Sequence, residues 1–526
     1  MAKILIAGSG FAGHYGALIL NDILKNKGTH EITVITPNTT FNYLPSLVWV
    51  GVNKMKAEKT QFNLKKIYDK VNINFKHAFI KEVHPDNNFV IIEPSDIDSD
   101  VKNLNNKHSG KMLSENANGK QHSTNGKAYN ENANINKPNN INSANIGEAN
   151  QNKIEYDFLL MATGPKLNFE ATENLNPEFG YNNSICTPHH AMDTAKNYLA
   201  LIERMKKGDK AKIFVGTGHG TATCQGAAFE YIANIHYDLV ERKLRDRAEI
   251  TWLSNEPKLG DFGMDGVEVR KESLIYTSEM MAEGVFNYCD IKYQIRSHVH
   301  KIDDKKIYTE NIDGEFKELD CNFAMLLPPF TGNSIKWIGK NGEDIKEKIC
   351  NPAGFIKVDA AYGKSYEELD GPDWPKTYQT QLYKNIFAAG INFAPPGPLS
   401  KPNKSPNGTT ISPAPPRTGY TAELSGKAAA LNIADMVEGK EPSHNASMAD
   451  TPGLCVASMK EGFFNGLAGT IAVYPVARNR KEYPEYGRNL DYSVAEVGKA
   501  GGWYKVGLHY SFLYKLQAKP GWKIIP

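Results

Sequence analysis

A chain of 526 residues is long enough for two or three domains, since a single domain usually holds roughly 100 to 200 residues. Its 61 Lys and Arg residues nearly balance its 59 Asp and Glu residues, so the net charge of +2 gives no overall reason to expect a nucleic-acid partner. Six cysteines at irregular intervals, none before position 186, resemble neither a disulfide framework nor the paired ligands of a zinc site, so no metal is expected. No run of roughly eighteen apolar residues and no secretory signal pattern is visible, which predicts neither a membrane-spanning helix nor export.

The chain begins with a short apolar stretch, residues 3–7, that predicts a buried strand. It runs directly into Gly8-Ser9-Gly10-Phe11-Ala12-Gly13, after which apolar residues continue at helical spacing. In a strand-turn-helix unit the first glycine allows the tight turn, the second lets the backbone approach a pyrophosphate, and the third lets helix and strand pack closely. The helix N-terminus then faces the phosphates. The segment predicts a dinucleotide-binding unit whose candidate contacts are Gly8, Gly10, Phe11, Ala12 and Gly13.

A second predicted strand, residues 31–36, follows at the spacing expected for this unit. It ends in Thr36-Pro37-Asn38 and lacks the acidic residue that usually binds the ribose hydroxyls. Thr36 and Asn38 are the candidates to replace that acid. The aromatic-rich stretch Phe41-Asn42-Tyr43-Leu44-Pro45 either lines a flat ring, which makes Pro45 a candidate contact, or packs in the core.

The composition changes abruptly at residues 95–153, which are rich in Asn, Lys, Ser and Gly and carry very few large apolar side chains. Such a segment cannot bury enough apolar surface to offset the entropy lost on ordering it, so we interpret it as a disordered insertion. Strand-like stretches flank it at residues 88–93 and 154–161. We therefore expect it to extend a hairpin turn, where long insertions are tolerated.

Two later strands each end on a glycine that is expected to approach the same cofactor. Residues 156–161 lead into Ala162-Thr163-Gly164-Pro165, which is typical of the second fingerprint of flavoproteins with two dinucleotide folds. Residues 385–389 lead into Gly390, where such chains usually return to the flavin. The acid that customarily follows this glycine is absent, and Ile391 stands in its place. The candidate contacts from these two turns are Thr163, Gly164 and Gly390.

A second strand-to-glycine unit lies at residues 212–220, and residues 250–253 supply a following strand. This turn continues through Thr221-Ala222-Thr223-Cys224 and does not enter a compact glycine-to-helix junction. We therefore expect a second Rossmann-like domain that holds no nucleotide. The alternative is a working nicotinamide site in which Glu256 contacts a ribose.

The first cysteine of the chain lies in Ser184-Ile185-Cys186-Thr187-Pro188-His189-His190. A thiol beside two histidines is a candidate nucleophile, although a free cysteine is more often a small buried hydrophobe. We expect both histidines at a helix start. There they are either ordinary polar side chains or groups that supply positive charge or move a proton.

Several motifs occur in a fixed order along nearly the whole chain outside residues 95–153. They are Asn42-Tyr43-Leu44-Pro45-Ser46 with Trp49-Val50-Gly51-Val52, Ala162-Thr163-Gly164-Pro165-Lys166-Leu167, Ser184-Ile185-Cys186-Thr187, Cys350-Asn351-Pro352-Ala353-Gly354-Phe355, Asn385-Ile386-Phe387-Ala388-Ala389-Gly390-Ile391, Pro416-Arg417-Thr418-Gly419-Tyr420 and Tyr486-Gly487-Arg488. In this combination the sequence resembles the sulfide:quinone oxidoreductase family. The resemblance implies an α/β fold with two Rossmann-like domains, FAD as the cofactor, and sulfide and a membrane quinone as substrates.

In that family two cysteines carry sulfur between them, and the resemblance assigns this pair to Cys186 and Cys350. Hydrosulfide is a soft nucleophile that attacks a disulfide or polysulfide bridge, so the two thiols are expected to face one another beside the flavin. One thiol retains the sulfur as a persulfide. The other, which we assign to Cys350, attacks the flavin and delivers two electrons. His190 or His189 is the candidate for lowering the thiolate pKa or moving a proton.

Three positions depart from the family pattern. Some relatives attach the flavin through a cysteine upstream of the first sulfur-carrying one, but residues 1–185 contain no cysteine, so we expect FAD to be held non-covalently. Some relatives carry a glutamate shortly after that cysteine, where this chain has Met192 and Asp193, and Asp193 is an untested substitute. Arg417 stands where relatives often have lysine, which keeps a positive charge at the start of a helix expected to point its N-terminus at the flavin.

The resemblance implies that the proline-rich residues 394–416 lie between the flavin and a membrane. Residues 503–516 then mix aromatic and apolar side chains with lysine and histidine, and Trp522 follows. Such a segment suits the headgroup boundary of a bilayer, so we expect it to lie on the membrane and to admit quinone from that face. The alternative is a tail packed onto the protein's own core or onto another subunit of a homo-oligomer.

The expected organisation is an FAD-binding domain at residues 1–178 and 359–436, a second Rossmann-like domain at 179–358, and a membrane-associated region at 437–526. The expected activity is oxidation of sulfide to sulfur or polysulfide with transfer of two electrons to quinone. Three rivals remain: a single-subunit NADH:quinone oxidoreductase, the flavin subunit of a cytochrome-linked sulfide dehydrogenase, and a non-catalytic membrane-associated binding protein. The first would need a competent second nucleotide site, the second is disfavoured by the lipid-facing tail, and the third would lack a yellow chromophore.

Overall fold

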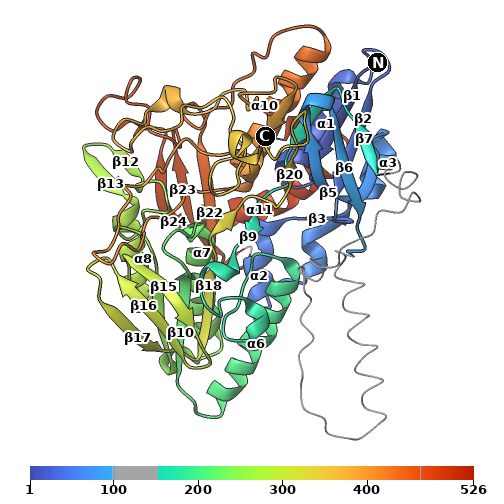
Figure 1. Ribbon diagram of the computed structural model, residues 1–526. Helices are drawn as coiled ribbons and strands as arrows, with labels where there is room; N and C mark the ends of the chain where they lie inside the picture. The colour runs from blue at the N-terminus through green and yellow to red at the C-terminus, as the bar shows by residue number, and fades with distance from the viewer. Residues whose placement is uncertain (98–99, 101–151, 463, 526) are drawn as a thin grey trace, which may run out of the picture.

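The computed structural model describes residues 1–97, 100, 152–462 and 464–525. Two α/β domains lie next to each other, the first around the N-terminal strands and the second around the green and yellow elements (Figure 1). The predicted insertion falls almost wholly outside the described residues. Its flanks are described: β6 (Phe89–Pro94) pairs antiparallel with β7 (Lys153–Glu155), so the insertion extends a hairpin as predicted.

The first domain is built on a sheet with the strand order β21-β8-β1-β2-β5-β6-β7, and β20 pairs with β5. Its strands β1, β2, β8 and β21 are largely buried and apolar, as is typical of strands covered on both faces. β1 pairs in parallel with β2 on one side and β8 on the other, which confirms the predicted strand-turn-helix unit as a Rossmann-like fold. These strands are β1 (Lys3–Ala7), β2 (Glu31–Thr36), β5 (Asn74–His84), β8 (Phe158–Met161), β20 (Lys336–Trp337) and β21 (Ile386–Ala388).

Two long helices, α1 (Phe11–Leu24) and α10 (Gly419–Val437), pack against each other in the first domain. Gly426 permits this close approach, because a Cβ atom there would lie 2.3 Å from the backbone oxygen of Ala12. α10 begins where the sequence predicts, since the Thr418 side chain accepts a hydrogen bond from the backbone N–H of Thr421. Short elements complete the domain: α2 (Leu47–Gly51), α3 (Leu64–Val71), β3 (Thr40–Asn42) and β4 (Gln61–Asn63).

The second domain contains a four-stranded parallel sheet in the order β14-β11-β10-β18, which confirms the second Rossmann-like unit. Its strands are β10 (Ala211–Thr217), β11 (Ala248–Leu253), β14 (Ile291–Gln294) and β18 (Phe323–Leu327). Its helices are α6 (Pro188–Lys206), α7 (Gln225–Glu241), α8 (Ser278–Cys289) and the short α9 (Lys346–Ile349). The antiparallel strands are β12 (Glu268–Lys271), β13 (Leu274–Thr277), β15 (Ser297–Ile302), β16 (Lys306–Asn311), β17 (Phe316–Asp320), β9 (Lys166–Leu167) and β19 (Phe330–Thr331).

The C-terminal region forms a three-stranded antiparallel sheet, β22 (Gly453–Lys460), β23 (Leu467–Val473) and β24 (Val494–Gly498), followed by α11 (Lys499–Leu516). One face of α11 is buried against the protein and includes Lys505, His509 and Phe512. The opposite face exposes aromatic side chains, of which Tyr504 is 65% and Tyr510 63% exposed. No helix among the described residues is long and apolar enough to cross a membrane.

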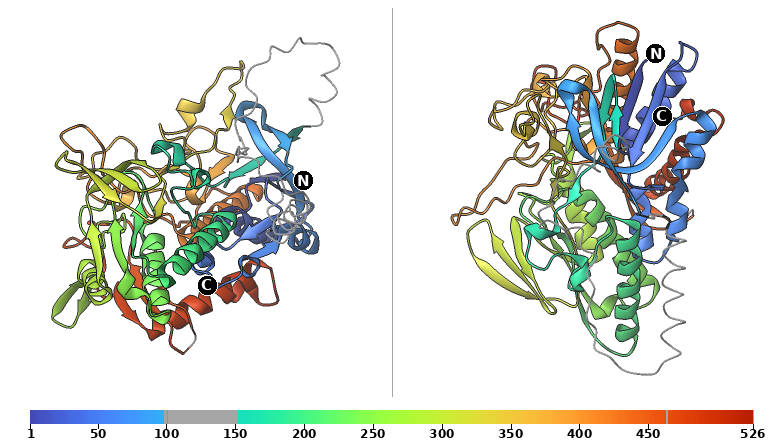
Figure 2. Two further views of the ribbon diagram at one scale, coloured as in Figure 1. Left: turned by 90° about the horizontal axis from the view of Figure 1, so that it is seen from below. Right: turned by 45° about the vertical axis from the view of Figure 1, so that its right-hand side comes forward.

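The last helix closes the first domain. The ring of Phe512 lies 6.3 Å from that of Phe11, and Nε2 of the buried His14 lies 2.6 Å from the carbonyl oxygen of Leu516. The other ring nitrogen of His14 lies 2.9 Å from the Tyr68 hydroxyl. Figure 2 shows α11, in red, running beside the blue N-terminal elements. The two ends of the chain therefore share one core.

Candidate cofactor and thiol site

In the first glycine turn, Gly8 and Gly13 lie against the protein's own backbone, whereas Gly10 borders open space. A Cβ atom at Gly8 would lie 2.2 Å from the backbone oxygen of Ala162, and one at Gly13 would lie 2.2 Å from that of Gly8. At Gly10 a Cβ atom would meet no atom within 4 Å. Because α1 begins at Phe11, its free backbone N–H groups face the same open space.

The two later glycine turns converge on the first. The backbone N–H of Ala162 donates to the carbonyl of Ala7, which holds the end of β8 against that of β1. A Cβ atom at Gly390 would lie 2.9 Å from Cβ of Ala12, whereas Gly164 borders open space. All three turns thus meet at the carboxyl ends of parallel strands, where open α/β sheets bind their ligands.

Asn392 is a candidate ligand contact that sequence reasoning missed. It is 3% exposed, its oxygen accepts a hydrogen bond from the Thr163 hydroxyl at 3.2 Å, and its amide nitrogen has no partner among the described residues. A buried donor without a partner is costly unless a ligand accepts from it. Asn392 follows Ile391, where the customary acid is missing, and its amide fits a ribityl hydroxyl or a phosphate oxygen. In the sequence, Asn392 could have been noticed as the polar residue that directly follows Ile391, the position where the acid is absent.

The candidates on the ribose side differ in accessibility. Thr36 is 1% exposed, and its hydroxyl oxygen accepts hydrogen bonds from the Ser9 hydroxyl at 2.9 Å and the Asn38 backbone N–H at 3.3 Å. Thr36 therefore holds the turn together, while Asn38 is only half-buried and is the more accessible of the two. Pro45 is also half-buried, and the Phe11 ring packs 5.8 Å from that of Tyr43, so this aromatic stretch does pack in the core.

Arg417 lies between two aromatic rings just before α10. Its guanidinium is 5.2 Å from the ring centroids of both Phe355 and Phe393, and it donates to the carbonyl of Phe393 at 3.2 Å. Burial lowers the pKa of Arg417 to about 10, so the group is still charged at neutral pH. Together with the N-terminus of α10, this charge favours an anionic group nearby. A narrow cavity here is lined by Tyr378, Gly390, Ile391, Phe393, Pro416, Arg417, Thr418, Thr421, Ala422 and Met448.

Cys186 ends an extended segment that runs beside β18 and precedes α6. Burial raises the pKa of its thiol to about 12, the Ser184 hydroxyl opposes this rise, and the Cys224 thiol adds to it. Cys224 itself precedes the first residue of α7.

Cys350 occupies a different environment. It is 4% exposed, follows α9 and pairs with Ile356, which in turn pairs with Phe393 of the Arg417 site. Burial raises the pKa of its thiol to about 11, against the opposing charges of Lys346 and Lys357. Cys350 is therefore joined to the Arg417 site through one intervening residue, Ile356. The pairing of Cys186 with Cys350 stays a prediction.

The two histidines after Cys186 do lie at a helix start, where the Thr187 hydroxyl accepts a hydrogen bond from the backbone N–H of His190 at 3.1 Å. His189 is exposed and lies 3.3 Å from Asp193, which is itself exposed. Burial, with a contribution from His189, lowers the pKa of His190 to about 4. His190 is therefore neutral at pH 7, so proton movement is the role that remains open to it.

The second glycine turn is filled by the protein itself. A Cβ atom at Gly218 would lie 2.6 Å from the Leu175 side chain, and one at Gly220 would lie 2.0 Å from the backbone oxygen of Thr410. Glu256 is fully buried, and its carboxylate accepts hydrogen bonds from the Ser254 hydroxyl and from the backbone N–H of Phe262. Neither the turn nor the acid is free to receive a nucleotide as it stands.

The buried Glu256 is expected to make stability depend on pH. Burial, reinforced by Asp261, raises its pKa from 4.5 to about 7, so the folded state keeps a proton that the unfolded chain releases across that interval. Stability should therefore fall as pH rises from about 4.5 to 7, by up to about 3 kcal/mol. Glu256→Gln should flatten this dependence in urea melts at pH 5 and pH 7.5. The exposed Glu178→Gln is the control, and an unchanged slope in Glu256→Gln would contradict the assignment.

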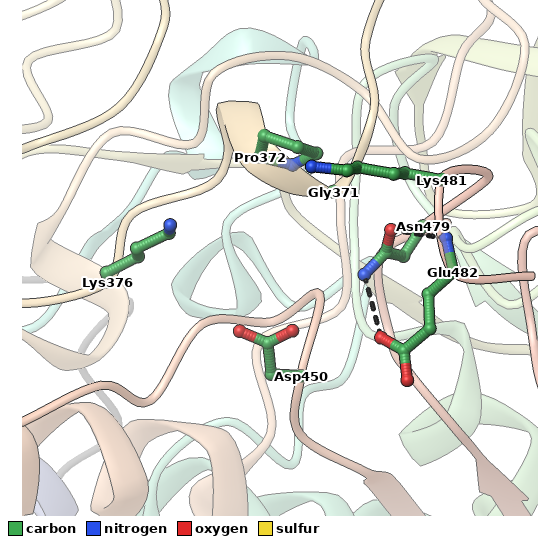
Figure 3. A pocket seen from close by; sticks show the side chains of 7 residues that line it. All are labelled: Gly371, Pro372, Lys376, Asp450, Asn479, Lys481 and Glu482. Atoms are coloured by element: carbon green, nitrogen blue, oxygen red, sulfur yellow. Dashed lines mark hydrogen bonds between the residues drawn. The ribbon is translucent and has the colours of Figure 1, made fainter.

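A second hollow has no residue in common with this site. Figure 3 shows it between the turn at Gly371 and the loop that carries Asn479, where the Asn479 amide donates to Glu482 at 3.3 Å. Its lining is Gly371, Pro372, Lys376, Asp450, Asn479, Lys481 and Glu482. No residue that the sequence singled out lines it.

Comparison with known proteins supports the resemblance. No protein-family model matches the chain. The sulfide-quinone reductase of Aquifex aeolicus is 24% identical over 521 residues, which cover 98% of this chain and 92% of that protein. The chain is a relative of the sulfide:quinone oxidoreductases. By this relationship and its fold, it is an oxidoreductase of the FAD-dependent class.

Two solved structures share the fold. The X-ray structure of the sulfide:quinone oxidoreductase from Aquifex aeolicus matches with a TM-score of 0.69 at 23% identity, covering 98% of this chain and 92% of that chain. The structure of NDH2 from Plasmodium falciparum in complex with NADH matches with a TM-score of 0.58 at 12% identity, covering 99% and 95%. The fold prediction of two Rossmann-like domains is therefore confirmed.

Proposed function

We propose that this protein oxidises sulfide to sulfur or polysulfide through FAD and thiols and passes two electrons to a membrane quinone. The observation that carries the proposal is the convergence of the open glycine turns and Arg417, with Cys224 against the backbone N–H of Arg417 and Cys350 joined to Phe393 through Ile356, in a chain similar along 98% of its length to a sulfide-quinone reductase. A redox thiol has to lie close to the cofactor that takes its electrons. The similarity to that reductase does not by itself say where the thiols of this chain lie relative to the cofactor site.

The residues present fit FAD, which when bound supplies the two-electron acceptor of the reaction. We propose that the turns at Gly10 and Gly164 receive its pyrophosphate and ribityl parts, because these positions border open space. The unpartnered amide of Asn392 would donate to the same ligand. Arg417 and the N-terminus of α10 would stabilise negative charge that develops on the reduced cofactor. With no cysteine in residues 1–185, we propose that FAD is held without a covalent thioether.

Cys186 is the proposed sulfur-accepting thiol, and the family resemblance makes Cys350 the second thiol of the pair. Both thiols carry raised pKa values through burial, so each needs a nearby group to take its proton. His190, neutral at pH 7 and with a buried ring nitrogen that has no partner among the described residues, is the proposed proton-moving group.

Peripheral membrane contact is proposed through the outer face of α11. Trp503 is 52% and Tyr504 65% exposed on this helix, and Ile524 beyond it is 87% exposed. Aromatic side chains with flanking lysines suit the headgroup region, and the inner face of the same helix packs against Phe11 and His14 of the first domain. A lipid-soluble quinone would then approach the cofactor from this side.

The reduction of bound FAD distinguishes this proposal from an NADH:quinone oxidoreductase. We expect anaerobic sodium sulfide to bleach the flavin absorbance of the purified protein, and NADH at the same concentration to leave it unchanged, because Leu175 and Thr410 fill the second glycine turn. The measurement is the absorbance near 450 nm, roughly where oxidised flavins absorb, before and after each addition. Bleaching by NADH without bleaching by sulfide would refute the proposal, and a colourless protein would favour a non-catalytic role.

A further inference from the structure

We infer that residues 403–411 of the proline-rich segment form an acid-sensitive latch that covers the second glycine turn. This latch hairpin is anchored on Glu310 and on a turn whose shape depends on His298. Acid neutralises the first group and charges the second, which releases the hairpin from both. The inference does not rest on the proposed function, because it concerns the position of a segment and not a reaction.

The latch hairpin is held together by its own backbone. The backbone N–H of Ser405 donates to the carbonyl of Thr409 at 2.9 Å, and that of Gly408 donates to the carbonyl of Ser405 at 3.0 Å. The backbone N–H of Ile411 donates to the carbonyl of Asn403 at 3.0 Å. These bonds lie within the hairpin and do not depend on its contacts with the second domain, so it can move as one piece.

The first anchor of the latch hairpin is the carboxylate of Glu310 on β16. It accepts hydrogen bonds from the Thr409 hydroxyl at 2.6 Å, from the Asn407 amide at 3.1 Å and from the Ser405 hydroxyl. Burial raises the pKa of Glu310, but these three hydrogen bonds outweigh it and hold the pKa below its usual value. Because hydrogen bonds to a charged acceptor are the stronger ones, protonation of Glu310 weakens all three.

The second anchor is the glycine turn itself, whose shape depends on His298 of β15. A Cβ atom at Gly220 would lie 2.0 Å from the backbone oxygen of Thr410, and the backbone N–H of Ser412 donates to the carbonyl of Gly220 at 2.8 Å. The backbone N–H of Gly220 in turn donates to Nδ1 of His298 at 2.9 Å. A ring nitrogen that accepts a hydrogen bond carries no proton, so the closed turn requires a neutral His298.

Two histidines and one carboxylate surround His298. The ring of His219, in the glycine turn, lies 4.6 Å from that of His298, and its own Nδ1 accepts from the backbone N–H of Thr221 at 3.1 Å. His300 follows on β15, and Glu310 is the residue opposite His298 on β16. Burial, with the two histidines, lowers the pKa of His298 to about 4, and Glu310 opposes this decrease. Protonation of His298 breaks its bond to Gly220 and places a charge beside His219.

Both anchors weaken as the pH falls. Because the pKa of His298 is lower in the closed state than its ordinary value of about 6.5, the latch is fully stable above that pH and loses stability as the pH falls towards 4. The lowered pKa of Glu310 acts in the same direction. Lys404, the cation of the hairpin, is exposed and makes no contribution to the pKa of His298.

The two ends of the proline-rich segment respond differently from its middle. Upstream, the Ser400 hydroxyl donates to Asp261 at 2.6 Å, and burial raises the pKa of Asp261 to about 6. A raised pKa means that this contact contributes its full stability in acid and loses it as the pH rises. Downstream, the Thr223 hydroxyl donates to the carbonyl of Pro415 at 2.9 Å, and neither group titrates. Acid is therefore expected to open residues 405–412 and to leave both ends attached.

Hydrogen–deuterium exchange of the intact, FAD-loaded protein tests the latch. The exchange rate of each peptide is measured at pH 7, 5.5 and 4 and corrected for the intrinsic pH dependence of amide exchange. If His298 has a pKa of about 6.5 in the open state and about 4 in the closed state, the open fraction rises roughly 100-fold between pH 7 and pH 4. We expect this rise in peptides that contain residues 405–412 or Gly220, and none in peptides from β18.

Three variants separate the two anchors. His298→Gln should remove most of the rise, because the glutamine oxygen can still accept from Gly220 but takes up no proton. Glu310→Ala removes the acceptor of the hairpin, so residues 405–412 should exchange rapidly at every pH. His444→Gln is the control, since His444 pairs with Asp435 outside this cluster, and it should behave as the wild type does.

Three outcomes would overturn the inference. The first is an exchange rate of residues 405–412 that does not change with pH in the wild type. The second is an equal rise in β1 and β18, which would mean that the whole protein unfolds in acid. The third is an unchanged rise in His298→Gln, which would place the proton elsewhere. Because the first two concern the wild type, the test does not depend on whether a variant folds.

Discussion

Cys186→Ser is expected to lower sulfide-dependent quinone reduction on the order of 1000-fold or more, because removing a nucleophile usually abolishes the chemistry that depends on it. A serine oxygen can form neither a disulfide nor a persulfide, so no sulfur atom can be held at this position. The pKa of the Cys186 thiol is already raised by burial, so a protonated serine introduces no new charge there. The measurement is quinone reduction with a water-soluble quinone under anaerobic conditions, alongside the flavin content of each preparation.

The matched controls for this prediction are other cysteines. Cys289→Ala should keep most of the activity, because Cys289 is a buried residue at the end of α8, outside the site. Cys350→Ser should lower the activity to a similar extent, and full activity in Cys350→Ser would contradict the assignment of Cys350 as the second thiol. If Cys186→Ser contained its full amount of flavin and reduced quinone at the wild-type rate, the Cys186 thiol would have no role in the reaction.

Lys515→Met is expected to cost about 3–5 kcal/mol of unfolding free energy, since it leaves a buried carboxylate without its counter-charge. Lys515 of α11 forms an ion pair with Glu423 of α10, and the two side chains are 2% and 4% exposed. The ammonium also lies 4.5 Å from the centroid of the Tyr15 ring. Burial raises the pKa of Glu423, so the loss should be larger at pH 8, where the carboxyl is charged, than at pH 5. Urea unfolding at both pH values measures it.

Two further variants show whether charge is the cause. The double variant Lys515→Met, Glu423→Leu should recover most of the lost stability, because replacing a whole buried pair with apolar side chains is often neutral. Lys523→Met removes a cation whose partner Asp22 lies near the surface, and it should cost no more than about 1 kcal/mol. If the double variant were as unstable as the single one, lost packing would be the explanation.

Much of the fold was predictable because its main signals are local. The strands at residues 3–7 and 31–36 have the bounds that the sequence predicts, and the helix after Arg417 begins at Gly419. Glycine at a turn and apolar runs in parallel strands are read from neighbouring residues alone. The position of α11 was not predictable in this way. Its lysines are typical of a membrane surface, yet Lys505 and Lys515 are buried in ion pairs with acids more than ninety residues away.

The site was predictable in part for a similar reason. The three glycine turns follow strands whose order in the sheet is implied by the dinucleotide motif, so their meeting point was expected. The surroundings of Cys186 were not, because they depend on how the segment before Cys186 joins β18 and on how α2 packs against Ile185. Asn392 was missed because an unpartnered amide is recognisable only when every nearby acceptor has been placed.

The contact between segments far apart in the sequence has a consequence for the order of folding. Residues near the start, such as Phe11 and His14, are packed by Phe512 and Leu516, and His14 and Leu516 are 502 positions apart in the sequence. Closing so long a loop costs chain entropy before the contact stabilises anything. We therefore expect this part of the first domain's core to form late in folding, after the local strand-turn-helix units.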